Sequence, residues 1–511
     1  MDSPITRRTL VKGGISAAAS LALPQLAAAS PLASGGDYGL SPTTAARSNP
    51  HAVEAAASVM STVAEYMKDA QTRPLPAEAA EHTRLHILDT FAAMVSGSAL
   101  APGKAALDFI RAYRGESGSK SDGASTVVAS TMRATPIEAA LANAVMAHAD
   151  ETDDSHAPSQ SHPGCAIVPA AFATCERFAT DGGRFMRAVA LGYDVGTRLN
   201  MSLHVSNFEV GNHQSSHAFG GIWGASAAAG CAASLSLKQL PWLLAYAADQ
   251  SSGLTVWQRD TDHIQKAFAF AGMGARNGVT AALVVHAGWT GVDDVFTGKY
   301  NFFNTYGPNA DLGVLADQLG IRYEVIRTNI KKWTVGSPIQ APLDALEAMR
   351  AKHPFDANQV QKVVVRSATS EAKLVDNREM PDICMQHMIA VMLLDKTATF
   401  ASAHDKARMQ APDVLRQRAK VTLIGDEELE RLLPTRVATV EVTLVDGTVL
   451  RERVEAVRGT AQNPMTADEI TRKARDLMAP ILGADKTSRL IGKLLALDSV
   501  RDVKELAPLL A

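Results

Sequence analysis

Residues 147–169 read AHADETDDSHAPSQSHPGCAIVP and concentrate ionisable side chains in one short segment. Four acids occupy five positions within it, and three histidines bracket them; these residues are Asp150, Glu151, Asp153, Asp154, His148, His156 and His162. Ser, Pro and Gln fill the gap, which predicts a loop, and the Ala-rich runs on both sides predict buried helices. Such charges are costly to bury unless they are paired or used. The segment is therefore either a solvated connection between helices or the centre of a functional site.

The composition indicates a globular protein of about two to four domains. Apolar residues make up 46% and charged residues 20% of the 511 positions, so large hydrophobic cores are available. The formal net charge is −3, and the sequence has no run of Lys and Arg interleaved with aromatic residues. A role in nucleic-acid binding is therefore disfavoured.

The N-terminus is expected to lie outside the fold. Residues 6–12 (TRRTLVK) resemble a twin-arginine export signal, a weakly apolar run follows, and the alanines at 27–29 suit a signal peptidase. We expect a signal peptide over 1–29, a linker over 30–48, and export to the periplasm or beyond it in a bacterium. Beyond this signal no stretch has the length and apolarity of a membrane span, so no membrane association is expected after cleavage.

The four cysteines, Cys165, Cys175, Cys231 and Cys384, form no CxxC pair. Cys165 and Cys175 fall in one predicted helix, where ten residues separate them by about 15 Å, which is too far for a disulfide. No disulfide framework is expected, and the spacing does not suit an iron–sulfur cluster.

The periodicity divides the remaining chain into three parts. Small and apolar residues at helical spacing predict an all-helical domain over 49–305, and strand composition predicts a smaller α/β domain over 315–460. The clearest hairpin spans 437–454 around Asp446-Gly447. Helical periodicity returns over 464–511. Within these parts we expect helices over 77–96, 165–178, 184–202, 222–234, 242–252, 278–287, 341–351 and 382–400, strands over 362–367 and 419–424, and a loop over 207–221.

The chain resembles the MmgE/PrpD family, which includes 2-methylcitrate dehydratase, cis-aconitate decarboxylase and iminodisuccinate epimerase. The family pattern AAL-N, H-A-x-[DE]-[FY]-D-D-T and H-P is matched between Ala139 and Gly164. Further matches are residues 88–90 (LDT) with Gly97, 191–196 (LGYDVG) with Arg198, 272–278 (GMGARNG), 287–291 (AGWTG), 330–333 (IKKW) and 463–466 (NPMT). Each motif is weak alone, but together and in this order they cover about residues 51 to 511.

The resemblance implies an α+β multidomain fold, in which the C-terminal helices complete the large helical domain and the α/β domain lies over a cleft. It also implies a homodimer that needs no cofactor or metal. The implied reaction is that of a lyase, which removes a proton or CO₂ next to a carboxylate of a small di- or tricarboxylate. Such chemistry requires cations to hold carboxylates and an acid or base with a pKa near neutrality, roles that suit Lys and His.

The resemblance carries five catalytic positions to this chain: Glu151, His162, His217, Lys266 and Lys331. His162, in the His-Pro pair, is the first candidate for acid/base chemistry. Lys266 is one residue out of register with the family lysine.

Other residues are expected to support the catalytic set. His148, Asp153 and Asp154 belong to this group, and the two aspartates are expected to orient His162 or to accept hydrogen bonds from backbone amides. His213 is the alternative to His217, which could instead cap a helix. His156 and His204 are expected to be solvated loop residues.

Three departures leave the substrate open. Gln340 stands where many family members have a histidine, Thr152 stands in place of an aromatic residue, and the export signal is unusual for propionate metabolism. An epimerase of the same family is one alternative. From other classes, a metal-dependent hydrolase would use the acids with His148, His156 and His162 as ligands, and a non-catalytic protein would only bind polycarboxylates.

Overall fold

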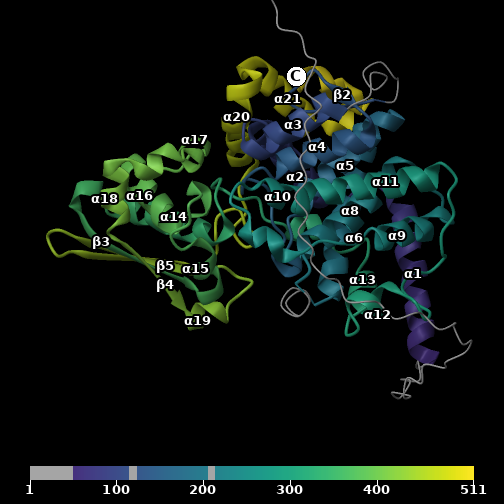
Figure 1. Cartoon of the computed structure of the whole chain (residues 1–511), viewed down its shortest axis with the longest axis horizontal. Helices are drawn as coiled ribbons and strands as arrows, with labels where there is room; N and C mark the ends of the chain where they lie inside the picture. The colour runs from purple at the N-terminus through teal and green to yellow at the C-terminus, as the bar shows by residue number, and fades with distance from the viewer. Residues whose placement is uncertain (1–49, 114–123, 205–212) are drawn as a thin grey trace, which may run out of the picture. The chain divides into compact units, whose positions relative to one another are not determined.

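The computed structural model describes residues 50–113, 124–204 and 213–511 (Figure 1). The expected signal peptide and linker lie outside these residues, as do positions 207–212 of the expected loop. The described chain is a mostly helical multidomain α+β fold with a small mixed sheet, as the sequence predicts.

The first part is built from helices that share one hydrophobic core. That core draws on residues from Met60 to Ile330 and again from Ile470 to Leu510. The C-terminal helices therefore complete the helical part, as the resemblance implies. Its helices are α1 (Pro50–Ala70), α2 (Ala77–Gly97), α3 (Ala101–Tyr113), α4 (Pro136–Ala147), α5 (Pro163–Phe178), α6 (Gly182–Ser202), α8 (Ser216–Ala232), α9 (Gln239–Asp249), α10 (Ile264–Ala267), α11 (Met273–His286), α12 (Phe302–Tyr306), α13 (Gly313–Ala316), α20 (Ala467–Leu482) and α21 (Ala484–Leu495). A two-stranded pair, β1 (Ser125–Thr126) with β2 (Arg133–Ala134), also belongs to it.

Small residues let the central helices approach one another closely. A Cβ added at Gly196 of α6 would lie 2.4 Å from the carbonyl oxygen of Gly220 in α8. A Cβ added at Gly278 of α11 would lie 2.5 Å from the Cβ of Ala225, also in α8. Helix α8 therefore packs closely against both α6 and α11.

The second part is a four-stranded sheet with helices packed on it (Figure 1). The strand order is β4 (Val421–Asp426), β3 (Val360–Ala368), β5 (Ala438–Leu444), β6 (Val449–Val454), with β3–β4 parallel and the other pairs antiparallel. Its larger helices, α14 (Ser337–Lys352) and α16 (Met385–Asp395), contact the sheet and form a second core with it. Its shorter helices are α15 (Thr369–Val375), α17 (Phe400–His404), α18 (Pro412–Arg418) and α19 (Glu427–Glu430). The hairpin β5–β6 turns at Gly447, whose φ of 86° favours glycine.

Several boundaries differ from the expectation by a few residues, and two of the differences affect the site or the division of the chain. Helix α8 begins at Ser216, so residues 216–221 are helical although their Gly and Ser content predicts a loop. Tertiary packing against α6 and α11 outweighs the low helix propensity of glycine there. The division between the two cores lies between Ile330 and Trp333, later than the expected break at 305–315.

The run Ile264–His286 is the one helix among the described residues with the length and apolarity to cross a bilayer, a span that the sequence analysis did not anticipate. It joins α10 and α11 through a π-helical turn at Phe268–Gly272. Of its most apolar window, 67% is buried within the protein. Its neighbours are α4, α5 and α8, which is the environment of a core helix.

The C-terminal helix α20 is tied to the acidic segment by one lysine. Lys473 Nζ lies 2.7 Å from Asp89 Oδ1 on α2 and donates a hydrogen bond of 3.0 Å to the Thr152 carbonyl oxygen. Both side chains of the ion pair are buried, with 6% of Lys473 and 1% of Asp89 exposed. Burial raises the pKa of Asp89 despite the adjacent Lys473 ammonium group. The pair thus joins three separate segments in a place without solvent.

We predict that Lys473→Met lowers the free energy of unfolding by about 3–5 kcal/mol, because it leaves the Asp89 carboxylate buried without its cation. Chemical denaturation followed by circular dichroism measures the change. The matched control is Lys493→Met, which breaks the exposed pair with Glu505 and should change the free energy of unfolding far less, because solvent screens that pair. The double variant Asp89→Asn/Lys473→Met should recover part of the loss. Equal destabilisation by the two lysine variants would contradict the prediction.

Candidate active site

The acidic segment is buried. The exposed fractions of Asp150, Glu151, Asp153 and Asp154 are 2%, 5%, 0% and 1%. The Thr135–Glu138 capping box starts α4, which ends at Ala147 and delivers the segment into the interior; α5 leaves it at Pro163. The interpretation as a solvated connection is therefore wrong, and each carboxylate requires a partner.

Asp153 joins two histidines. Its Oδ2 lies 2.9 Å from His148 Nδ1, and its Oδ1 lies 3.2 Å from His162 Nδ1. Burial would raise the pKa of Asp153, but the two imidazoles hold it well below its usual range. A carboxylate at Nδ1 places the proton of a neutral ring on that nitrogen and leaves Nε2 as the acceptor. Asp153 thus contacts His162 at the ring nitrogen through which the expected orienting role would act.

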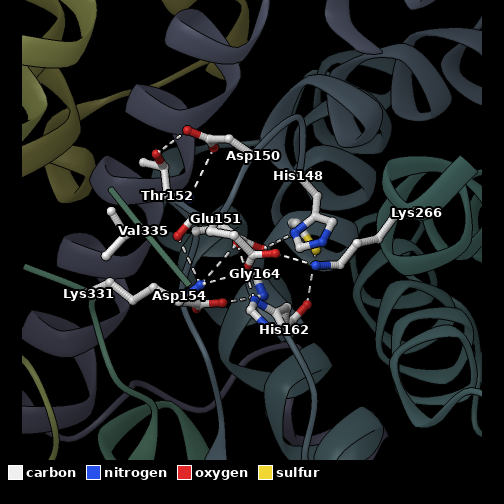
Figure 2. A network of polar contacts seen from close by, with 12 residues as sticks. His148, Asp150, Glu151, Thr152, Asp154, His162, Gly164, Lys266, Lys331 and Val335 are labelled. Carbon is white, nitrogen blue, oxygen red and sulfur yellow. Dashed lines mark hydrogen bonds and ion pairs between the residues drawn. The ribbon is translucent and has the colours of Figure 1, made fainter. Parts of the chain in front are cut away.

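Glu151 lies between two lysines that approach from opposite sides (Figure 2). Lys266 Nζ donates to Glu151 Oε1. Lys331 Nζ donates to the Glu151 carbonyl oxygen at 2.9 Å and to Oε2 at 3.4 Å, and lies 3.8 Å from Asp153 Oδ1. Burial would raise the pKa of Glu151, but the two ammonium groups hold it well below its usual range. Glu151 is therefore an anion that fixes two cations in place.

The contacts of Asp154 hold neighbouring elements together. It accepts hydrogen bonds from the Tyr193 hydroxyl at 2.5 Å and from the Gly164 backbone amide at 3.0 Å, and it lies 2.9 Å from His86 Nδ1. The expected acceptance from a backbone amide is thus confirmed. Gly164 is required here because an added Cβ would lie 2.8 Å from Asp154 Oδ2. This contact fixes the start of α5, directly after His162.

Asp150 connects the acidic segment to the second part of the protein. It accepts hydrogen bonds from the Thr152 amide and hydroxyl, and its Oδ2 lies 2.9 Å from His404 Nε2 at the end of α17. The other ring nitrogen of His404 lies 2.6 Å from the Phe400 carbonyl oxygen. Burial would lower the pKa of His404, but Asp150 raises it to about 9. An imidazolium thus forms an ion pair between the two parts at neutral pH.

An aromatic surface carries the histidines. The ring of His217 stacks on Phe270 at 3.7 Å, and His148 stacks on Phe270 at 4.6 Å. His162 lies 5.3 Å from His217, between ring centroids, and Lys266 Nζ lies 5.1 Å from the Phe270 centroid. Phe270 belongs to the π-helical turn that precedes α11. Burial lowers the pKa of His162 and of His217, so both imidazoles are neutral near pH 7.

A cavity of about 290 Å³ lies where these side chains meet the second part of the protein. Four expected catalytic residues line it: Glu151, His162, His217 and Lys266. Lys331 instead lines an adjoining cavity of about 160 Å³, and it contacts the first set through Glu151. The structure therefore brings all five residues together, four of them around one cavity.

The remaining expected residues occupy distinct places. His213 is exposed, and its backbone oxygen accepts a hydrogen bond from Thr255, so its side chain is not part of the cavity lining. The N-cap of α8 is Ser215, and His217 is the second residue of the helix, within its first turn, so it does not cap the helix. His156 is buried against Glu324 at 3.3 Å, so its expected solvation is wrong, whereas His204 is exposed.

Sequence reasoning missed several lining residues. His263 is buried in a left-handed conformation, with φ of 61°, and burial holds its pKa well below the usual value. The others are Trp257, Asp260, Phe270, Glu371, Arg378 and Arg436. They lie in stretches of sequence without a recognisable motif. The sequence therefore marked each of them only as a single charged or aromatic residue. Gln340 does not face this cavity, because its side chain bonds the backbone of Trp333 and Val335.

Two groups of side chains could in principle hold a metal ion: His148, Asp153 and His162, and His148, Glu151 and His263, with donor atoms within 4.8 Å of one another. The ammonium groups of Lys266 and Lys331 already neutralise Glu151. The set expected for a hydrolase is not assembled, because His156 is paired with Glu324.

Comparisons with known proteins cover both parts of the chain. The family model described as the MmgE/PrpD N-terminal domain matches residues 61–314, and the one described as the C-terminal domain matches residues 333–497. A cis-aconitate decarboxylase of Aspergillus terreus is 23% identical over 488 residues, covering 88% of this chain and 96% of that protein. The cis-aconitate decarboxylase-like protein oryM of Aspergillus oryzae is 23% identical over 484 residues, covering 89% and 97%.

We predict that the His404–Asp150 pair makes stability depend on pH. The pKa of His404 is raised to about 9 in the folded protein, above about 6.5 in an unfolded chain. Its contribution is therefore complete below about pH 6.5 and is lost as pH rises through about 9. His404→Gln should lower the free energy of unfolding by about 1–3 kcal/mol near pH 6 and by less near pH 10.

Denaturation at several pH values tests this prediction, with His353→Gln as the control because His353 is an exposed histidine of the same part. A loss in His404→Gln that is the same at all pH values would contradict it.

Proposed function

Because the chain belongs to the MmgE/PrpD family, we propose that it is a lyase that acts on a small di- or tricarboxylate, as a decarboxylase or a dehydratase. The observation that carries the proposal is the convergence of two neutral histidines, His162 and His217, with the Glu151-paired Lys266 on one cavity of about 290 Å³. Membership and the two fungal relatives support lyase-type chemistry. At 23% identity they support no particular substrate, so cis-aconitate is only the first compound to assay.

His162 is proposed to move the proton. Its Nδ1 faces Asp153 at 3.2 Å, so the neutral ring presents Nε2 as a base. Burial lowers the pKa of His162, which keeps the base unprotonated at neutral pH. The Asp153 carboxylate would stabilise the imidazolium that forms when the base accepts a proton. Asp153 thus acts through His162 rather than on the substrate.

Lys266 is proposed to stabilise the charge that develops on the reacting carboxylate. Its ammonium group lies above the Phe270 ring and against Glu151, so it is held before substrate enters. Preorganised cations of this kind stabilise a transition state without further reorganisation. Lys331 holds Glu151 from the other side and keeps its carboxylate turned toward Lys266.

The proposed site can support two alternative reactions, a dehydration and a decarboxylation. In a dehydration, His162 takes a proton from the carbon next to a carboxylate, the C–O bond on the adjacent carbon breaks, and the leaving hydroxide takes that proton from the His162 imidazolium, so that water departs. In a decarboxylation of an unsaturated acid, the C–C bond to the carboxylate breaks, CO₂ leaves, the double bond shifts, and the far carbon of the former double bond takes a proton that water supplies through His162. The second route needs no hydroxyl on the substrate. The relatives' printed name favours it.

An epimerase would use the same proton abstraction and return the proton to the opposite face of the same carbon.

We also propose that the protein is a homodimer and that it is exported by the twin-arginine route. Light scattering tests the first proposal, and fractionation of a cell that expresses the full chain tests the second.

We predict that His162→Gln lowers kcat by about 10²–10⁴-fold with the substrate that the wild type turns over best. Citrate, 2-methylcitrate and cis-aconitate are assayed first, by product absorbance and by CO₂ release. His353→Gln, an exposed histidine, should leave kcat unchanged. Deuterium entering a substrate without net product would favour the epimerase. Absence of turnover and of exchange across a wider di- and tricarboxylate panel would overturn the proposal.

For the dehydration route, in which His162 acts as a base, we also predict an acidic limb in the pH profile. The pKa of His162 is lowered by burial, so kcat/KM should be lost as pH falls through a value below about 6.5 and should be constant just above it. In Asp153→Asn the neighbouring anion is gone, so this limb should move to still lower pH while kcat falls. A limb that stays in place in Asp153→Asn would exclude His162 as the base.

A further inference from the structure

The cavity contains one cation that no carboxylate neutralises. Its lining includes three acids and three long cationic side chains, so its net charge alone does not select an anion. Lys266 is paired with Glu151, and Arg436 Nε lies 2.6 Å from Glu371 Oε1. The third acid, Asp260, accepts a hydrogen bond from the backbone amide of Lys266. Among the residues that the structure describes, the Arg378 guanidinium has no ion-pair partner.

The turn that carries Arg378 is held rigidly. It follows α15 and begins at Asn377, whose φ of 45° lies in the left-handed region that asparagine tolerates. The backbone amide of Asn377 donates a hydrogen bond to Gln386 Oε1 at 2.9 Å, and Gln386 Nε2 donates one to Asp376 Oδ1 at 2.6 Å. Gln386 lies on α16 and is buried. The second part of the protein thus presents Arg378 to the cavity from a fixed backbone.

The histidines and Lys266 line the same cavity from the helical part. A ligand in the cavity can therefore contact the proton-transfer groups of the helical part and the unpaired guanidinium of the second part. Guanidinium groups bind carboxylates through two parallel hydrogen bonds. The cavity volume of about 290 Å³ lies at the small end for ligand sites.

We propose that Arg378 binds a second carboxylate of the substrate, remote from the one that reacts near His162, and so selects polycarboxylates over monocarboxylates. This inference rests on the proposed function and deepens it, because it names the residue that recognises the non-reacting end. It also assigns a role to the second part of the protein, which then contributes directly to substrate binding.

The test is direct binding of propane-1,2,3-tricarboxylate, an unreactive probe, by isothermal titration calorimetry. Arg378→Met should weaken binding by about 10- to 100-fold, the loss expected for a charge-assisted pair. Arg378→Lys, which keeps the charge and loses the paired geometry, should lie between Arg378→Met and the wild type. The matched control is Lys373→Met, which removes an exposed cation from the adjacent helix α15 and should bind within about twofold of the wild type.

The outcomes separate the two proposals. Wild-type binding that Arg378→Met leaves within twofold would overturn the role of Arg378 while leaving a polycarboxylate site in place. Failure of the wild type to bind propane-1,2,3-tricarboxylate, succinate or glutarate would overturn both the substrate class and this inference. Thermal unfolding of each variant shows that it is folded, and if Arg378→Met does not fold, Arg378→Lys carries the comparison.

Discussion

The burial of four carboxylates in one segment is the constraint on which the arrangement of the described chain depends. Each acid requires a partner, and the partners come from distant parts of the sequence. Asp154 meets Tyr193 of α6, Glu151 meets Lys266 and Lys331, and Asp150 meets His404 of the second part. The segment therefore forms ion pairs with both parts of the protein, and substitutions within it are expected to affect stability and chemistry together.

The same pairing explains the electrostatic character of the cavity. Glu151 and Asp153 stay ionised because lysines and imidazoles surround them, although burial alone would raise the pKa of both. The imidazoles of His162 and His217 stay neutral because burial disfavours their protonated, charged forms and so lowers the pKa of both. Anionic carboxylates beside neutral imidazoles give a site that can accept a proton at neutral pH.

The sequence predicted most of the fold and part of the site, for physical reasons that differ. The hairpin β5–β6 and the C-terminal helices follow local signals, namely alternation, an Asp-Gly turn and helical periodicity. The start of α8 did not follow such a signal, because Gly and Ser favour a loop and only packing against α6 and α11 makes residues 216–221 helical. Motifs located His162 and His217, but not Arg378 or His263, whose positions depend on how two distant segments fold toward one cavity.

The contact of Lys473 with Asp89 has a consequence for the order in which the protein can form. Asp89 emerges from the ribosome early, but its cation lies in α20, near the end of the chain. The helical core is thus closed by a contact between residues almost four hundred positions apart, and such long-range closure is slow. Until synthesis reaches α20, the Asp89 carboxylate and the Thr152 carbonyl oxygen both lack their partner, Lys473. We therefore expect the helical core and the neighbouring cavity to be completed together, when translation is nearly finished.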